Sequence, residues 1–161
     1  MAGKQLKPNT MRILERGNVP YEPLFYDLGD VEFDGIAVAK ALNTDPEHCY
    51  KTLCAVGKSG DHYIFVIPVA EEVDLKLAAS ACGEKNVALV HVKELPELTG
   101  YERGAVSPLG LKRNFPIYFE ETALLFETIE VSGGMKGCSL RVEPNALADL
   151  LQAKFAPLIR I

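Results

Sequence analysis

A lysine stands inside a stretch of sequence that otherwise has the character of a buried strand. Residues 49–57 read CYKTLCAVG, so Lys51 lies among Leu53, Cys54 and other residues that favour an apolar environment. An unpaired ammonium is costly to bury. Lys51 therefore either reaches solvent from the edge of a sheet or meets an anion, and the residue types alone leave both interpretations open.

Two glycine-containing loops offer main-chain N–H groups that suit such an anion. Residues 104–108 read GAVSP, and residues 132–137 read SGGMKG and carry Lys136. Consecutive amides in turns of this kind form concavities that bind anions. Taken alone, the first loop is an ordinary surface connection and the second a hairpin turn. Together with Lys51, they predict a pocket for a carbonyl or phosphate in which fixed donors stabilise developing charge.

The sequence lacks the familiar patterns of zinc metalloproteases, serine hydrolases and P-loop nucleotide-binding proteins. HExxH, GxSxG and GxxxxGK[ST] are absent, the three histidines have no ligand spacing, and the four cysteines form no CxxC pair. We therefore expect no metal and no cofactor. We interpret the cysteines as reduced thiols of a cytosolic protein, while a Cys–His pair assembled in space stays open as an alternative.

Composition narrows the class of protein. The chain has 161 residues, 48% of them apolar and 24% charged, which suits one domain with a single core. A net charge of −5 argues against an extended nucleic-acid groove, and so against a DNA partner, but allows a grip on one end of a nucleic acid. No stretch resembles a signal peptide or a membrane span, so we expect a cytoplasmic protein with no membrane partner.

Apolar runs and turn residues predict the elements that position these groups. Helices are expected at residues 7–17, 33–43, 74–83, 91–100 with an interruption at Pro96, and 143–155. Strands are expected at residues 21–28, 50–57, 62–69, 86–90, 115–120, 124–132 and 138–142. Pro23 lacks a donor and indicates an edge strand. Because helices and strands do not alternate regularly, we predict an α+β (mixed α/β) fold, with a mixed, partly barrel-like sheet surrounded by helices in one domain.

At these residues the sequence resembles the YbaK/EbsC family, which includes the Cys-tRNA(Pro) deacylases and is related to the editing insertion of bacterial prolyl-tRNA synthetases. The motifs that carry the resemblance are CYKTLCAVG, PVAEEVDLKLAA, TGYERGAVSPLGLKR, VSGGMKGCSLRV and DLLQAKFA. The resemblance implies one editing domain over residues 1–161. It also implies a trans-editing enzyme that hydrolyses the ester of a mischarged tRNA, with Cys-tRNA(Pro) as the expected substrate.

The resemblance assigns site residues as well. The family's lysine falls on Lys51 and its GxxxP loop on residues 104–108, which makes Lys51 and Gly104 the implied catalytic positions. Substrate contacts are implied for residues of an early pocket, of the lysine strand and of the two loops: Tyr26, Phe33, Thr52, Ala105, Val106, Ser107, Pro108, Ser132, Gly133, Gly134, Lys136 and Ser139.

Two positions depart from the pattern of the cysteine-specific members. Ser139 stands where those members carry an aspartate, and Lys136 stands where an arginine is expected. Neither change removes the lysine or the GxxxP loop. Both leave the amino-acid preference open between cysteine, alanine and serine.

The implied partner is the 3′ end of an aminoacyl-tRNA, with prolyl-tRNA synthetase as a candidate partner protein. Arg103, Lys112 and Arg113 are candidates for contacts with phosphates near that end. The alternative from another class is a non-catalytic module that binds a nucleotide or a tRNA end, and Ser139 keeps it open.

Overall fold

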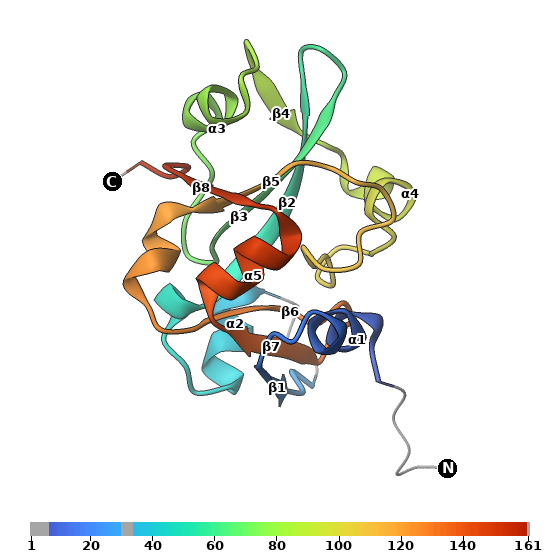
Figure 1. The fold of residues 1–161 in the computed structure, drawn as a ribbon, viewed down its shortest axis with the longest axis vertical. Coiled ribbons are helices and arrows are strands. Elements are labelled where there is room, and N and C mark those ends of the chain that lie inside the picture. Colours follow the sequence, from blue (N-terminus) through green and yellow to red (C-terminus); the bar gives the residue numbers. More distant parts are fainter. Residues whose placement is uncertain (1–6, 30–33, 161) are drawn as a thin grey trace.

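Two β-sheets that meet at a single bridge organise the chain (Figure 1). The computed structural model describes residues 7–29 and 34–160. The smaller sheet is antiparallel, has the order β1-β7-β6, and consists of β1 (Tyr21–Phe25), β6 (Ile129–Ser132) and β7 (Cys138–Val142). The larger sheet has the order β4-β2-β3-β5-β8 and consists of β2 (Tyr50–Gly57), β3 (His62–Pro68), β4 (Val87–Leu89), β5 (Ile117–Glu120) and β8 (Lys154–Ala156).

The larger sheet is mixed. Strand β2 pairs antiparallel with β3 and β4, whereas β5 pairs parallel with β3 and β8.

The helices in the described residues are α1 (Asn9–Arg16), α2 (Gly35–Ala41), α3 (Leu75–Cys82), α4 (Leu95–Thr99) and α5 (Pro144–Leu151), with short 3₁₀ turns η1 (Pro46–His48), η2 (Val92–Glu94) and η3 (Glu121–Leu125). The mixed α+β fold in one domain is confirmed, and the described strands form no closed barrel.

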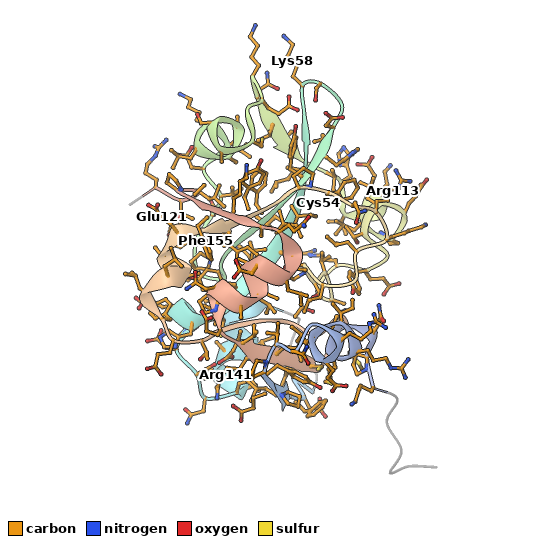
Figure 2. The ribbon with its side chains drawn as sticks, viewed as in Figure 1. Cys54, Lys58, Arg113, Glu121, Arg141 and Phe155 are labelled. Carbon is orange, nitrogen blue, oxygen red and sulfur yellow. The ribbon has the colours of Figure 1, made fainter. Side chains whose placement is uncertain are left out.

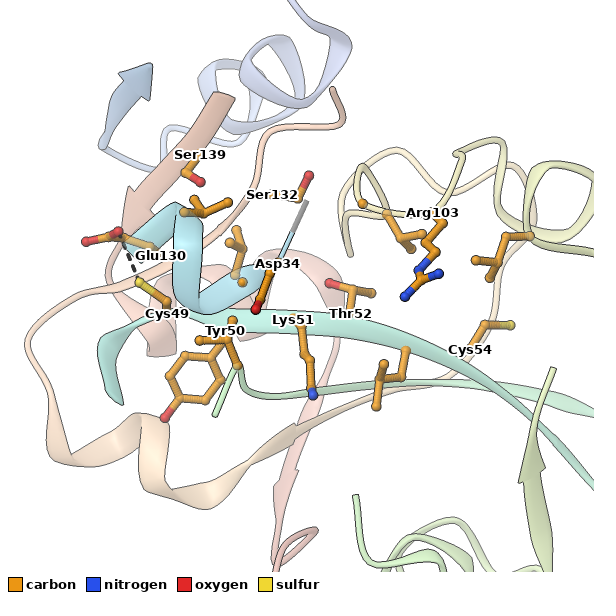
Figure 3. Close-up of a pocket in the computed structure, with 18 of the residues that line it drawn as sticks. Asp34, Cys49, Tyr50, Lys51, Thr52, Cys54, Arg103, Glu130, Ser132 and Ser139 are labelled. Atoms are coloured by element: carbon orange, nitrogen blue, oxygen red, sulfur yellow. Dashed lines mark hydrogen bonds between the residues drawn. The ribbon is translucent and has the colours of Figure 1, made fainter. Parts of the chain in front are cut away.

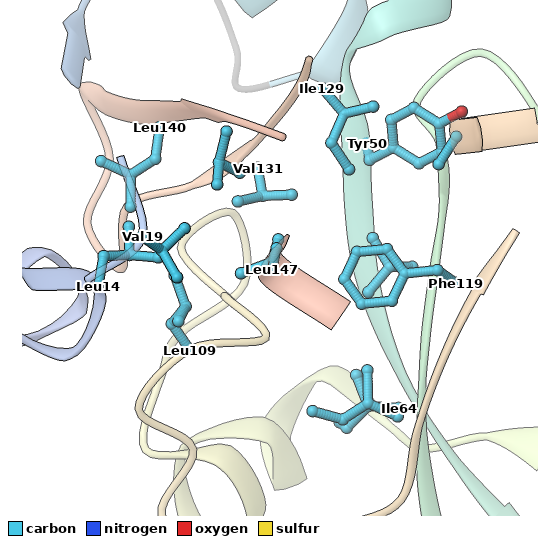
Figure 4. Close-up of a cluster of buried hydrophobic side chains, with 14 of the residues drawn as sticks. Leu14, Val19, Tyr50, Ile64, Leu109, Phe119, Ile129, Val131, Leu140 and Leu147 are labelled. Carbon is cyan, nitrogen blue, oxygen red and sulfur yellow. The ribbon is translucent and has the colours of Figure 1, made fainter. Parts of the chain in front are cut away.

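The main core fills the space between the two sheets, where α1 and α5 also contribute (Figure 4). Leu14, Ile64, Phe119, Leu140 and Leu147 are fully buried there. A second cluster lies on the other face of the larger sheet under α3. Strand β3 lies between the two clusters, which explains why residues 63–67 form an unbroken apolar run rather than an alternating one.

Local sequence signals account for most helix boundaries. The Asp34 carboxylate accepts a hydrogen bond from the Ile36 amide at 2.9 Å and begins α2. Asp74 does the same for α3 by accepting from the Lys76 and Leu77 amides, and Gly83 ends that helix with φ +75°. Strand β1 is an edge strand, as Pro23 predicts.

Three sequence-based expectations are wrong in detail. Pro96 does not interrupt a helix but lies in the first turn of α4, where a proline loses no intrahelical hydrogen bond. Residues 121–125 form a 3₁₀ turn, capped by the Glu120 carboxylate that accepts from the Thr122 amide at 2.6 Å, so strand β6 begins only at Ile129. The last helix stops at Gln152, which has φ 55°, and residues 154–156 pair with β5.

A buried ion pair holds the junction of the two sheets. Cys49, next to β2, bridges to Glu130 of β6. The Glu130 side chain is 5% exposed and accepts hydrogen bonds from Arg141 Nη2 at 3.0 Å, Thr44 Oγ1 at 3.2 Å and Cys49 Sγ at 3.5 Å. Arg141 also reaches the exposed Glu22 at 3.0 Å. The junction therefore combines one main-chain bridge with a satisfied buried carboxylate.

We predict that Arg141→Met destabilises the protein, because it leaves the Glu130 charge buried without its cation. The unfolding free energy should fall by about 2–3 kcal/mol, below the full cost of breaking a buried pair because Arg141 is partly exposed. The matched control is Glu22→Gln, which removes only the exposed partner and should cost less than about 1 kcal/mol. Urea unfolding of the three proteins measures both. Equal stability of Arg141→Met and wild type would contradict the assigned role.

Candidate active site

A cleft of about 800 Å³ runs along one edge of β2 (Figure 3). Residues 49–54 form its floor, and parts of α2, the loop around Gly104, β6 and β7 form its walls. Because the cleft follows the edge of a strand, side chains from both faces of the sheet can line it. Lys51 and Thr52 do so from opposite sides of β2.

Lys51 is half-buried at the edge of this cleft. Burial lowers the pKa of Lys51, while the negative charges of Glu72, Asp34 and Glu71 act in the opposite direction. The ammonium forms no ion pair within 4.0 Å with any residue in the described ranges. It is therefore a partly desolvated cation that can bind an anionic or carbonyl group entering the cleft.

Thr52 presents a buried hydroxyl without a partner. The residue is 9% exposed, and among the described residues its Oγ1 is the buried side-chain oxygen or nitrogen atom that makes no hydrogen bond. Neighbouring Tyr50 and Cys54, on the same face, pack into the main core. A buried polar atom normally has a partner, so the Thr52 hydroxyl is suited to a group supplied from outside the chain.

Gly104 brings the GAVSP loop to the cleft. Its φ of +88° lies in the region that favours glycine. The loop is tied to the β6–β7 turn by one side chain: the Ser132 hydroxyl donates to the Ala105 carbonyl at 3.0 Å and accepts from the Gly134 amide at 3.0 Å. The two glycine loops are thus joined, with Gly104, Val106 and Ser132 facing the cleft.

Tyr26 and Ser139 line the same cleft from the smaller sheet. Tyr26 is anchored by its amide, which donates to the Gly137 carbonyl at 3.0 Å, and burial raises the pKa of its phenol. Ser139 is buried on β7, opposite Ser132 of β6. Its hydroxyl forms no hydrogen bond with the residues that the structure describes.

The other expected site residues lie outside the cleft lining. Ala105, Ser107 and Pro108 are buried behind the loop, where the Ser107 hydroxyl accepts from the Leu109 amide at 3.2 Å. Gly133, Gly134 and Lys136 belong to the β6–β7 turn, and the Gly133 carbonyl accepts from Thr10 at 2.7 Å. Phe33 lies outside the described residues.

Two charged residues of the cleft, Asp34 and Glu130, were not among the expected site residues, whereas Arg103 lines it as a candidate for phosphate contacts. Glu130 interrupts an apolar strand just as Lys51 does, so the same signal could have found it. Arg103 directly precedes Gly104 and is exposed. In Figure 3 its guanidinium lies on the Thr52 side of β2.

The cysteines of the cleft are poor nucleophiles. Burial raises the pKa of Cys49 to about 12 and that of Cys54 to about 11. The reactive species of a cysteine is the thiolate, which is scarce near neutral pH at these values. The raised pKa values of Cys49 and Cys54 therefore disfavour either thiol as the nucleophile of this cleft. Within the described ranges, no group of three or more His, Cys, Asp or Glu side chains is arranged to hold a metal ion.

A family model for the aminoacyl-tRNA editing domain matches residues 34–150. A relative from Enterococcus faecalis, EbsC, described as a candidate Cys-tRNA(Pro)/Cys-tRNA(Cys) deacylase, is 37% identical over 152 residues and is matched over 94% of this chain and 93% of its own. A solved structure described as a candidate trans-editing enzyme for prolyl tRNA synthetase has 25% identity and a TM-score of 0.80, covering 98% of this chain and 100% of that one. The hypothetical protein APE2540 has the same fold, with a TM-score of 0.85 at 22% identity over 93% of this chain and 98% of its own.

The chain belongs to the aminoacyl-tRNA editing domain family. It is a hydrolase of the ester bond of aminoacyl-tRNA, and the resemblance to the YbaK/EbsC family is confirmed. No helix in the described parts of the chain has the length and apolar character needed to cross a membrane.

We predict that Thr52→Val separates function from stability. Valine has a similar shape and removes an unpartnered buried hydroxyl, so the unfolding free energy should stay constant or rise by up to about 1 kcal/mol. Deacylation should slow about tenfold, because a hydrogen bond to substrate is lost. Thr10→Val is the control. The Thr10 hydroxyl has a hydrogen-bond partner, so the unfolding free energy of this variant should fall by about 1–3 kcal/mol. Thermal melts and single-turnover rates test both, and equal destabilisation of the two variants would refute the assignment.

Proposed function

We propose that this protein edits tRNA in trans by hydrolysing the ester of Cys-tRNA(Pro), and that the editing unit extends over residues 1–161. One observation carries the proposal: a single cleft is lined by the Gly104 loop and by two polar groups, the Lys51 cation and the Thr52 hydroxyl, that have no partner among the described residues. The descriptions of EbsC and of the trans-editing structure support the choice of substrate. Translation takes place in the cytoplasm, where we expect the protein to act.

Lys51 and the Gly104 loop have complementary roles in this mechanism. The ammonium of Lys51 binds a phosphate of the terminal nucleotide or polarises the ester carbonyl. The main-chain N–H groups of Gly104 and Val106, which line the cleft, hold the oxyanion that develops as the carbonyl is attacked. Loss of one such donor typically costs about 2.7–4 kcal/mol. Lys51 projects from the opposite side of β2, so its flexible stem must extend around the open strand edge to reach the same ester.

A cysteine substrate brings its own nucleophile. Its sulfur attacks the ester carbonyl, the bond from that carbonyl to the ribose oxygen breaks, and the ribose oxygen takes up the thiol proton. The cyclic thioester that results is then hydrolysed by water. This route needs no nucleophile from the protein, which agrees with the raised pKa values of Cys49 and Cys54.

Ser139 favours a second candidate, a deacylase for alanine or serine. Ser139 lines the cleft, and its hydroxyl makes no hydrogen bond with the described residues, so it can orient a water molecule where the substrate lacks a thiol. For either substrate, the cleft can select small amino acids by excluding larger side chains sterically. Favourable contact with one additional methylene would give only about 1–3 kcal/mol of discrimination.

The proposed contact with tRNA is confined to its 3′ end. Arg103 lines the cleft and is exposed, so it suits a phosphate of the terminal nucleotides. The net charge of −5 disfavours a long electrostatic interface. A grip of this kind is weak, and we therefore propose that a synthetase such as prolyl-tRNA synthetase delivers the substrate.

The test of the substrate is deacylation of a tRNA panel by the purified protein. The panel contains Cys-tRNA(Pro), Ala-tRNA(Pro), Ser-tRNA(Pro) and Pro-tRNA(Pro). We expect Cys-tRNA(Pro) to be hydrolysed fastest and Pro-tRNA(Pro) to be spared. The ratio of kcat/KM values gives the preference directly. Fastest hydrolysis of the alanyl or seryl ester would select the second candidate, and no hydrolysis of any member would reject both.

We predict that Lys51→Ala lowers single-turnover deacylation by roughly 100- to 1000-fold, by analogy with the loss of one charge-stabilising donor. Its melting temperature should change little, since no described residue loses an ion pair. Lys51→Arg should rescue poorly, because a planar fork does not replace a compact ammonium in a tight site. The control is Lys58→Ala, an exposed lysine at the far end of the same strand hairpin, which should be silent (Figure 2). Full activity in Lys51→Ala would disprove the role.

A further inference from the structure

The outer edge of β2 has a regular orientation of main-chain groups. On the inner side, the Val69 amide donates to the Cys49 carbonyl at 2.8 Å and the Gly57 amide donates to Asp61 at 2.8 Å, so odd-numbered residues face β3. On the outer side, the Val90 amide donates to the Cys54 carbonyl at 3.1 Å. Because N–H and C=O groups alternate along a strand, the N–H and C=O of Thr52 point outward.

No described strand pairs with this outer edge beside Thr52. Strand β4 covers β2 only from Ala55 to Gly57, with the Val90 bond as its last contact. At the other end, β6 meets the edge at the single bridge between Cys49 and Glu130. The gap between these two contacts is the floor of the cleft, so the Thr52 main chain faces the space that substrate enters. An open strand edge is a template for pairing with another extended group.

An aminoacyl ester has the groups that such an edge requires. In an antiparallel sheet, two opposed residues exchange both bonds: each N–H donates to the other's C=O. The α-ammonium and ester carbonyl of an aminoacyl group flank one Cα and can point in the same direction, as the N–H and C=O of a strand residue do. The charged ammonium makes the stronger of the two bonds.

We propose that the aminoacyl group binds as a one-residue strand against Thr52, an inference that rests on the proposed function. The α-ammonium donates to the Thr52 carbonyl, and the ester carbonyl accepts from the Thr52 amide. Opposed residues of an antiparallel pair place their side chains on the same face of the sheet. The substrate side chain therefore lies beside the Thr52 hydroxyl, which has no partner among the described residues. The main chain of β2 binds the ammonium in the same way whichever small side chain the substrate carries.

The neighbouring carboxylates offer a competing site for the ammonium. Asp34 lines the cleft, but its Oδ1 already caps α2. Glu130 lines it too, but its two oxygens are occupied by Arg141, Thr44 and Cys49. Thr52 provides an acceptor that lies in the unpaired part of the strand edge.

The test compares two stable analogues of the tRNA end, each an adenosine with a 3′-amide in place of the ester. One carries cysteine and the other carries 3-mercaptopropionate, which lacks the α-amino group. Calorimetry at pH 6.5, where the α-amino group is protonated, should give roughly 10- to 100-fold tighter binding of the cysteine probe. Equal affinities would overturn the proposal.

Main-chain ester variants of the full-length protein locate the acceptor. Replacing Leu53 by its α-hydroxy acid weakens the Thr52 carbonyl as an acceptor and should reduce the discrimination to below roughly threefold, since ester carbonyls accept hydrogen bonds poorly. The same replacement at Ala55 loses an equivalent inward N–H but leaves Thr52 unchanged, so it should preserve the discrimination. If the Leu53 variant still binds the cysteine probe more tightly than the 3-mercaptopropionate probe to the same degree, the proposal is overturned. If Asp34→Asn abolishes this difference in affinity, the Asp34 carboxylate is the group that binds the ammonium.

The two hypotheses fail in different ways. If the protein hydrolyses Cys-tRNA(Pro) but binds the two probes equally well, the one-residue-strand binding mode is rejected and the proposed function is kept. In the opposite outcome, the cysteine probe binds more tightly and loses this advantage in the Leu53 variant, but no tested aminoacyl-tRNA is hydrolysed. The proposed function is then rejected and the binding mode is kept.

Discussion

The cleft exists because β6 meets β2 at one residue pair and then continues along β7 instead. A second or third bridge beyond Glu130 would have covered the edge of β2 and filled the space beside Thr52. Glu130, the β6 residue of this bridge, has a buried carboxylate, whose burial is tolerable only because Arg141, Thr44 and Cys49 satisfy its oxygens. The strand edge therefore opens directly beside a satisfied charged pair at the junction of the two sheets.

The remaining walls depend on that junction. Ser132, two residues after Glu130, ties the β6–β7 turn to the Gly104 loop through the Ala105 carbonyl. The Gly104 loop has no regular secondary structure, so this tie and the buried Ser107 and Leu109 are what hold it against the core. Donors on this loop are thus positioned through the same strand that leaves the edge of β2 exposed.

Sequence patterns predicted the parts of the fold that local chemistry determines. Capping aspartates, a glycine stop and apolar runs located α2, α3, β2 and β3 correctly, and the cost of burying a charge singled out Lys51. The same rule applied to Glu130 would have found the junction. Pairing across the chain could not be inferred in this way: β8 is only three residues long and is a strand because β5 lies beside it. The burial of Ser107 and Pro108 behind their loop also depends on contacts between distant segments, so the sequence does not indicate which residues of the loop line the cleft.

An uncovered strand edge carries a hazard of self-association, because another chain can pair with it as readily as a ligand can. Natural sheets blunt such edges with charged residues, lysine above all, placed where a second strand would have to bury them. Lys51 occupies this position on β2, between the apolar residues of a segment that would otherwise be prone to self-association. A lysine kept for the reaction would then also protect the solubility of the folded chain, and any redesign that empties this position would have to supply another charge along the edge to keep copies of the protein apart.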